Sequence, residues 1–230
     1  MKTSRAIAVA ALLVLASLRV FAADAAQSPA NPEQMNRMGL LYATGTGVPQ
    51  DYIAALAWYQ RAAEGGSTSA MNNIATIYFH GLGVPQSYEE TVKWLRLAVK
   101  QGDATAQNRL GTMYDAGLGV TRNAHDAFEL FTQAANQGYA PGMANLGRAY
   151  ARGAGVKKDE PRAYTLISAA MEIGLRAGER DAAMYELGAL SQRLDAKQIE
   201  RAQLDARAMV ETRSKEASAR EVTASNAYRL

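Results

Sequence analysis

The chain has 230 residues, of which 48% are apolar and 20% charged, a composition that supports a buried core and argues against intrinsic disorder. Alanine, leucine and methionine are frequent and long β-branched runs are absent, so a mostly helical protein is expected. The formal net charge of +3 includes Lys2, Arg5 and Arg19, and without these three the 22 acidic residues balance the basic ones. A neutral chain lacks the basic surface that phosphate binding requires, which argues against nucleic acid as a partner.

The first 22 residues have the pattern of a secretory signal peptide. A short basic start, 1–5, precedes the apolar stretch 6–18, and Val20-Phe21-Ala22 offers a cleavage site, with a second at Ala23-Asp24-Ala25. The alternative, an uncleaved membrane anchor, is weaker because the apolar stretch is too short to cross about 30 Å of hydrocarbon.

The sequence contains no cysteine, which excludes a lipid-modified cysteine, a disulfide and thiol chemistry. Export without disulfides fits a bacterial protein that relies on packing alone. We therefore expect a cleavable signal peptide at 1–22, a periplasmic or secreted location, and no lipid anchor.

A segment that begins with tyrosine and ends in Gly-x-Gly-Val occurs four times, and each tyrosine lies 36 residues after the last. Self-similarity at this period is typical of a solenoid, in which each unit buries its apolar face against its neighbours. After a linker at 23–30, the sequence therefore predicts four repeats: 31–66, 67–102, 103–138 and 139–174.

Each repeat is expected to begin with a helix A. We call a set of equivalent positions in the four repeats a slot. The first slot of helix A is a helix-capping position, held by Asn31, Ser67, Asp103 and Tyr139. A small residue between large apolar ones predicts a closely packed core face, at Gly39, Ala75, Gly111 and Gly147. The first glycine of Gly-x-Gly is placed to end the helix in a left-handed conformation. A phosphate-binding loop is disfavoured, because the motif follows a helix and has no Lys-Ser/Thr pair.

A second slot marks the start of a helix B, since it holds only residues that cap helices: Asp51, Ser87, Asn123 and Asp159. Ser87-x-x-Glu90 adds a capping box. A strict alanine follows beside large apolar residues, so helices A and B are expected to pack as a hairpin. Trp58 and Trp94 are assigned to the core rather than to ligand stacking, because leucine fills their slot in the other two repeats.

The pattern Leu110-Gly111-x-x-Tyr114-x-x-Gly117-x-Gly119-Val120, followed by Ala134-Ala135-x-x-Gly138, resembles the Sel-one-like repeat, a relative of the tetratricopeptide repeat. The resemblance covers 31–174, with mild departures at Ala75 and Val99. It implies an all-α, right-handed α/α superhelical solenoid of helix-turn-helix repeats. It also implies a non-catalytic adaptor, often in bacterial envelope assemblies or signalling, without an active site.

The period slips after Gly174. Residues 175–213 are expected to hold a partial fifth unit, with its helix at 179–191, and a C-terminal capping helix that starts at Asp195-x-x-Gln198. This helix has an apolar stripe at Ile199, Ala202, Ala206, Met209 and Val210. A partner-binding amphipathic helix is the alternative. Residues 214–230 lack periodicity and are expected to form a frayed tail.

The sequence offers no convergent catalytic groups. His80 and His125 occupy different slots, no cluster has metal-site spacing, and no Gly-x-Ser-x-Gly elbow is present. We therefore expect no enzyme, no cofactor and no metal. The alternative function, a cell-wall module that binds or cleaves carbohydrate or peptide, is disfavoured. Sugar stacking needs exposed aromatics, and a hydrolase needs facing carboxylates or a metal.

Slots opposite the core face of helix A vary between repeats and are expected to line a concave groove. There, Arg109, Arg148 and Arg152 would meet the carboxylates of an extended or helical segment of a partner protein. Phe79 is expected to be an exposed aromatic anchor. The predicted partner-binding set is Arg37, Asn73, Phe79, His80, Arg109, Asn145, Arg148 and Arg152. The alternative is a solvated face without function. The expected partner is an envelope or membrane-associated protein, and the expected state is a monomer.

Overall fold

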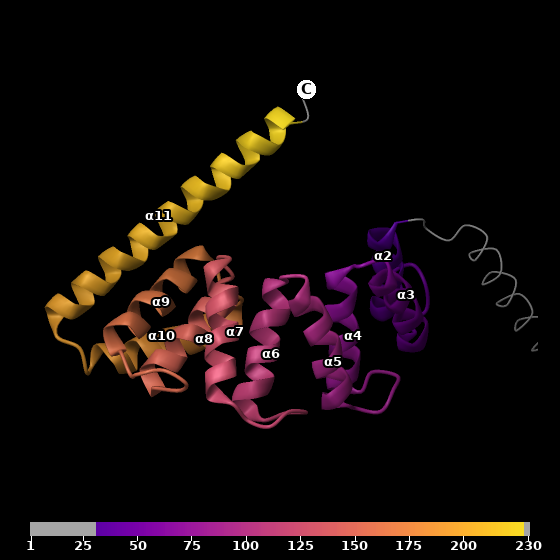
Figure 1. Cartoon of the computed structure of the whole chain (residues 1–230), viewed down its shortest axis with the longest axis horizontal. Coiled ribbons are helices and arrows are strands. Elements are labelled where there is room, and N and C mark those ends of the chain that lie inside the picture. Colours follow the sequence, from indigo (N-terminus) through magenta and orange to yellow (C-terminus); the bar gives the residue numbers. More distant parts are fainter. Residues whose placement is uncertain (1–30, 228–230) are drawn as a thin grey trace, which may run out of the picture. The chain divides into compact units, whose positions relative to one another are not determined.

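The computed structural model describes residues 31–227, shown as the coloured ribbon in Figure 1. The predicted signal peptide and linker, and residues 228–230 of the predicted tail, lie outside the described residues. The chain divides into two compact units, of which the first ends at Ala70 and the second begins at Met71. The two units are described separately.

The described residues form ten helices and no strand, which confirms the all-α fold class and the alternation of helices A and B. None of these helices combines the length and the hydropathy that a bilayer crossing requires. Their bounds are α2 Pro32–Thr44, α3 Tyr52–Glu64, α4 Thr68–His80, α5 Tyr88–Lys100, α6 Ala104–Ala116, α7 Ala124–Asn136, α8 Ala140–Arg152, α9 Glu160–Ile173, α10 Ala177–Ser191 and α11 Ala196–Ala227.

The first unit contains the hairpin of α2 and α3 and the start of α4. Its packing confirms the small slot of helix A, because a Cβ on Gly39 would lie only 2.5 Å from the ring of Tyr59. Tyr59 is buried, and this burial raises the pKa of its phenol to about 12. Trp58 is buried beside it, as predicted.

The same small slot repeats in the second unit, where a Cβ on Gly111 or Gly147 would meet the side chain of Phe131 or Ile167 at 2.7 Å. The strict alanine of helix B is fully buried in every repeat, at Ala62, Ala98, Ala134 and Ala170. Each of these small side chains allows helices A and B of one repeat to approach closely.

The predicted helix caps are present, with two differences. The side chains of Asn31, Ser67 and Asp103 accept hydrogen bonds from the first turns of their helices, whereas Tyr139 makes no side-chain cap. The predicted capping box at Ser87 is incomplete. The Ser87 hydroxyl accepts from the Glu90 N–H at 3.1 Å, but the Glu90 carboxylate pairs with Lys93 instead of the Ser87 backbone.

The reason for the incomplete box is a backbone hydrogen bond that recurs in every hairpin. The N–H of Ser87 donates to the carbonyl of Tyr78 at 2.9 Å, so it is not available to Glu90. The same bond joins each cap of helix B to the motif tyrosine of its own repeat, in the pairs Asp51–Tyr42, Asn123–Tyr114 and Asp159–Tyr150. This bond fixes how the chain turns from helix A into helix B.

The two glycines of Gly-x-Gly have different roles. The first ends helix A in the left-handed region, for example Gly153 at a φ of 68°. The second also has a positive φ, and it lies against the start of the preceding helix B: Gly119 against Tyr88, and Gly155 against Ala124 and His125. A Cβ at Gly155 would collide with backbone atoms there. The motif therefore connects neighbouring repeats as well as ending helix A.

In the second unit, helices from α5 to α9 pack in chain order, as Figure 1 shows. The core residues Leu95, Phe131 and Ile167 are buried, as predicted. Trp94 is a correction, because it is only partly buried. Its indole ring is larger than the leucines in the equivalent slot, and tryptophan is rarely covered completely.

The end of the chain departs from the repeat pattern. Both α10 and α11 pack on α9. The Leu187-Gly188 pair resembles the start of a helix A, but a Cβ added to Gly188 would have no atom within 4 Å, so this glycine does not lie in a close helix contact. The predicted capping box of α11 is complete, since Asp195 and Gln198 exchange side-chain to backbone hydrogen bonds at 2.8 and 3.0 Å. Ala202 and Ala206 of the predicted stripe are buried.

The predicted frayed tail is wrong for residues 214–227, which continue α11 to Ala227. The packed first half of α11 supplies the costly nucleus, and a helix then propagates through alanine, glutamate, lysine and arginine, which have favourable helix propensity. Arg213 marks where the packed part ends, because its Nη1 donates to the carbonyl of Asn136 at the end of α7 at 3.3 Å.

Candidate binding surfaces

Polar side chains on the A helices of the second unit link each A helix to the next. Nη1 of Arg109 donates to the backbone carbonyl of Asn72 at 2.9 Å, which joins α6 to α4. Nη2 of Arg152 donates to Asp115 at 2.9 Å, which joins α8 to α6. Several of the residues predicted to face a partner therefore already make contacts between repeats.

Asn145 belongs to the same series of contacts. Its Nδ2 donates to Oδ1 of Asn108 on α6 at 2.8 Å, and its Oδ1 accepts from Nη1 of Arg148 at 2.7 Å. Arg148 also pairs through Nε with Oε1 of Glu186 on α10 at 2.7 Å. Asn145 thus holds Arg148 in a fixed orientation.

Three of the predicted partner-binding residues, which lie on two helices, line one pocket. The Arg109 pocket has a volume of about 270 Å³ and lies between α4, α5 and α6. Buried residues form its floor and polar or aromatic ones its rim; the lining residues are Phe79, His80, Thr91, Leu95, Arg109, Thr112 and Met113. Its hydrogen-bond donors at the rim are the side chains of His80 and Arg109, because the Thr112 hydroxyl donates to the carbonyl of Asn108 at 3.1 Å.

Arg109 differs from Arg148 and Arg152, because no carboxylate lies within ion-pair distance of it in the part of the chain that the structure describes. Burial lowers the pKa of its guanidinium from the ordinary value, and Tyr139 and Asp103 offset only part of this effect. An arginine stays protonated even so, and the pocket therefore holds a partly desolvated positive charge.

Phe79 is a correction to the sequence analysis, because it is partly buried rather than exposed. Its ring packs edge-on against His80 with centroids 4.9 Å apart, and lies 5.4 Å from the ring of Tyr88. The neighbouring aromatic side chains explain this burial. His80 itself is exposed, at the last position of α4.

Arg148 and Arg152 line a second pocket, the α10 pocket, of about 170 Å³. Its lining residues come from α8, α9, α10 and the turn after α10: Arg148, Ala151, Arg152, Ile167, Tyr185, Glu186, Ala189, Leu190 and Arg193. The sequence analysis did not identify Tyr185, Glu186 and Arg193. The repeat period fails in this segment, so these residues could not be compared slot by slot.

The two remaining predicted residues lie outside both pockets. Asn73 is partly buried on α4 and makes contacts of its own. Arg37 is exposed on α2, in the first unit. The structure thus brings together three predicted residues in the Arg109 pocket, and Arg148 and Arg152 with Asn145 beside the α10 pocket.

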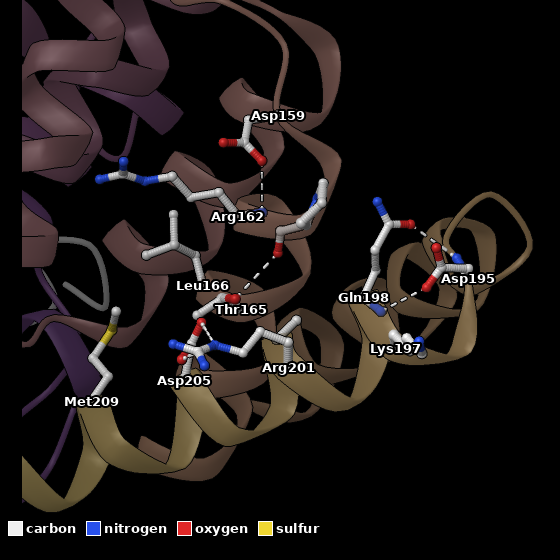
Figure 2. Close-up of a pocket in the computed structure, with 12 residues that line it drawn as sticks. Asp159, Arg162, Thr165, Leu166, Asp195, Lys197, Gln198, Arg201, Asp205 and Met209 are labelled. Carbon is white, nitrogen blue, oxygen red and sulfur yellow. Dashed lines mark hydrogen bonds and ion pairs between the residues drawn. The ribbon is translucent and has the colours of Figure 1, made fainter.

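A larger groove of about 570 Å³ lies between α9 and α11, and none of the predicted residues lines it. Figure 2 shows Arg201 beside Asp205 on α11, and the capping pair Asp195 and Gln198 at the helix start. The Asp159 side chain, also drawn there, caps α9. Arg162 and Lys197 also line the groove, and neither forms an ion pair within residues 31–227. Both are exposed to solvent, whereas the charge of Arg109 is partly buried, and this burial distinguishes the Arg109 pocket.

Within residues 31–227, no group of histidine, cysteine, aspartate or glutamate has the arrangement of a metal site. His125 lies in the first turn of α7, where its backbone N–H donates to the Asn123 side chain.

Comparison with known proteins identifies the repeat. The family model described as Sel1 repeat matches residues 32–67, 68–103, 104–139 and 140–172, one residue later than the predicted starts. The crystal structure of c5321, a protective antigen present in uropathogenic Escherichia coli strains and displaying an SLR fold, is similar with 28% identity and a TM-score of 0.71. That match covers 84% of this chain and 40% of c5321, so the chain spans less than half the length of c5321.

A Sel1 repeat protein from Oxalobacter formigenes is also similar, with 30% identity and a TM-score of 0.65. The match covers 76% of this chain and 70% of that protein. No curated protein matches the chain.

Proposed function

Because the chain belongs to the Sel1 repeat family, whose members are generally non-catalytic scaffolds for protein–protein interaction, we propose that it binds an acidic segment of a partner protein through the Arg109 pocket. The segment lies along the A helices of the second unit and places an aspartate or glutamate side chain against Arg109. The protein then acts as an adaptor.

The observation that carries this proposal is the guanidinium of Arg109 without a carboxylate partner. Among the described residues, its hydrogen bond goes to the carbonyl of Asn72. This acceptor is neutral, whereas a carboxylate would bring a full negative charge to the guanidinium and add Coulomb attraction in a partly desolvated pocket. A ligand carboxylate would therefore gain more from this arginine than from one that is already paired.

The rest of the pocket suits a side chain with an apolar stem. Leu95 and Met113 supply apolar floor atoms, and Phe79 supplies an aromatic edge at the rim. The His80 imidazole adds a polar group at the rim, whereas the Thr112 hydroxyl already donates to the carbonyl of Asn108. Arg148 and Arg152 are not assigned to this segment, because Glu186 and Asp115 already offset part of their charge.

We place this adaptor in the bacterial envelope or outside the cell. The support is the leader pattern of residues 1–22 together with the absence of cysteine. A protein partner exposed to the same compartment follows from that location.

A cell-wall carbohydrate module finds less support. Trp58 is buried and Trp94 is partly buried, so neither offers an open indole face for sugar stacking. Tyr185 is exposed, but it lies among arginines rather than beside a second exposed aromatic ring of the pocket.

The experiment is affinity capture from an envelope extract of the source bacterium, with the chain from Ala23 as bait. Arg109→Gln removes the charge at the pocket, and Arg207→Gln is the matched control because Arg207 is exposed on α11 and lines none of these pockets. We expect at least one partner protein to be captured by the wild type and by Arg207→Gln but not by Arg109→Gln. Equal retention by Arg109→Gln would refute the assignment of the pocket.

A further inference from the structure

The α10 pocket has a small apolar floor. Ile167 and Leu190 are almost completely buried, and Ala151 and Ala189 complete the apolar lining. The volume of about 170 Å³ suits one aliphatic side chain rather than an extended peptide.

Three guanidinium groups from α8 and the turn after α10 surround this floor. Each is oriented by a carboxylate through a single nitrogen: Arg148 by Glu186 at 2.7 Å, Arg152 by Asp115 at 2.9 Å and Arg193 by Glu160 at 2.8 Å. A guanidinium carries five N–H donors, so each keeps donors that these contacts leave available. The arginines are thus held in place and can still bind an anion.

One acceptor in the pocket lacks a donor. Oε1 of Glu186 is engaged by Arg148, but Oε2 is buried and has no hydrogen-bond partner among the residues that the structure describes. A buried carboxylate oxygen without a donor is costly, and a ligand that brings an N–H group would remove that cost.

The mouth of the pocket carries an unusually exposed aromatic side chain. Tyr185 is 81% exposed, the highest value among the large apolar residues of the described chain, and the adjacent Met184 is 57% exposed. Tyrosine at such a position is typical of binding hot spots, since it offers a large rigid contact area and a polar end.

From this combination we propose that the α10 pocket binds the C-terminal residue of a partner polypeptide, an aliphatic residue with a free α-carboxylate. The carboxylate binds the guanidiniums of Arg148 and Arg152. The last peptide N–H donates to Glu186, and the aliphatic side chain fills the floor formed by Ile167 and Leu190. Tyr185 packs along the preceding residue.

A chain terminus fits better than an internal acidic side chain. The terminal residue presents a carboxylate, an N–H and an aliphatic side chain from one Cα, which matches the three features of the pocket. An internal aspartate or glutamate has no aliphatic side chain besides its own carboxylate. This inference does not rest on the proposed function, because Arg109 and its pocket take no part in it.

The test uses the full chain from Ala23 and a fluorescein-labelled peptide, Gly-Ser-Gly-Ser-Leu, with either a free or an amidated C-terminus. Binding is followed by fluorescence anisotropy. We expect the free acid to bind at least about tenfold more tightly than the amide, a difference that corresponds to the loss of one charge-assisted interaction. Arg152→Gln and Tyr185→Ala should each weaken binding of the free acid by a similar factor.

Two controls keep the result specific. Arg201→Gln changes an ion-paired arginine in the groove between α9 and α11 and should leave binding unchanged, as should Arg109→Gln. Circular dichroism checks that each variant is folded, and we expect Tyr185→Ala to keep the fold because the Tyr185 side chain is exposed. Equal binding of acid and amide, no binding of either, or a loss with Arg109→Gln instead of Arg152→Gln would each overturn the proposal.

Discussion

Arg109 donates to the carbonyl of Asn72 at 2.9 Å, and the same carbonyl also accepts from the hydroxyl of Thr76 at 3.0 Å. Loss of the arginine would therefore leave no buried acceptor without a donor. One dispensable hydrogen bond does not explain why a partly desolvated charge is kept at this position. The partner carboxylate that we propose would give this charge a role, because stability and function often oppose each other at binding sites.

Replacing the second glycine of the motif should lower the free energy of unfolding by more than the strain of its backbone conformation alone. Gly153 and Gly155 have φ values of 68° and 74°, so alanine is strained at both by about 1–2 kcal/mol. Gly153→Ala meets its nearest atom at 3.4 Å, whereas Gly155→Ala collides with the backbone at Ala124. We expect Gly155→Ala to lose clearly more unfolding free energy in urea titrations. Equal losses would show that the contact between repeats carries no energy.

The alanine slot of helix B should not tolerate a larger side chain. Ala98 is fully buried, and Ala98→Leu should lower the free energy of unfolding by about 1–3 kcal/mol through overpacking. Leu97→Ala, at a neighbouring position that is 37% exposed, is the control and should have a smaller effect. An unchanged melting temperature for Ala98→Leu would contradict the tight packing of this joint.

Glu160 should contribute a pH-dependent part of the stability. The hydrogen bond from Lys158, and then the charges of Arg193 and Lys158, hold the pKa of the Glu160 carboxyl below its ordinary value, against the opposing effect of its burial. A carboxyl with a lowered pKa stabilises the fold above its ordinary pKa, and this stabilisation is lost as the pH falls through the lowered value. Glu160→Gln should therefore destabilise the protein at neutral pH and destabilise it less near about pH 3.

The matched control for this prediction is Glu129→Gln, which changes an exposed glutamate on α7 that forms no ion pair within the described part of the chain. Urea unfolding followed by circular dichroism gives the stability at each pH. A loss for Glu160→Gln that is the same at both pH values would refute the linkage.

The start of α11 depends on its capping box. Asp195→Ala removes the acceptor of the Gln198 N–H, and we expect a loss of about 1 kcal/mol in thermal or urea unfolding. Asp181→Ala, at an exposed position inside α10, should have no such cost because alanine favours a helix interior. If both variants have the same stability, α11 is held by its packing on α9 alone.

Much of the fold could be predicted because the four repeats provide four residues for each equivalent position, and these can be compared. The caps at Asp51 and Ser87 and the left-handed glycine at Gly45 follow from residue chemistry that is local. The second role of Gly155 could not be predicted, because it depends on which helix lies against it. The helix from Ser214 to Ala227 was missed, since its propensity is sufficient only when the preceding turns are already formed.

For the binding residues, the sequence could predict only the helix face on which they lie. Arg109, Arg148 and Arg152 occupy related slots. The sequence does not reveal that Arg148 and Arg152 pair with Glu186 and Asp115, while Arg109 has no carboxylate partner within residues 31–227. Those partners lie 37 or 38 residues away in the chain, and for Glu186 the repeat period no longer applies. Tyr185 lies in the same irregular segment, which explains why the α10 pocket was not predicted.

The most direct test of the central claim is to replace Arg109 with methionine, which keeps an unbranched apolar stem and removes the charge. We expect Arg109→Met to leave the free energy of unfolding unchanged or to raise it by up to about 1 kcal/mol, while the partner captured by the wild type is lost. Urea unfolding and capture are measured on the same preparation. A variant that is destabilised by more than about 2 kcal/mol and still captures the partner would show that Arg109 serves the fold and not the partner.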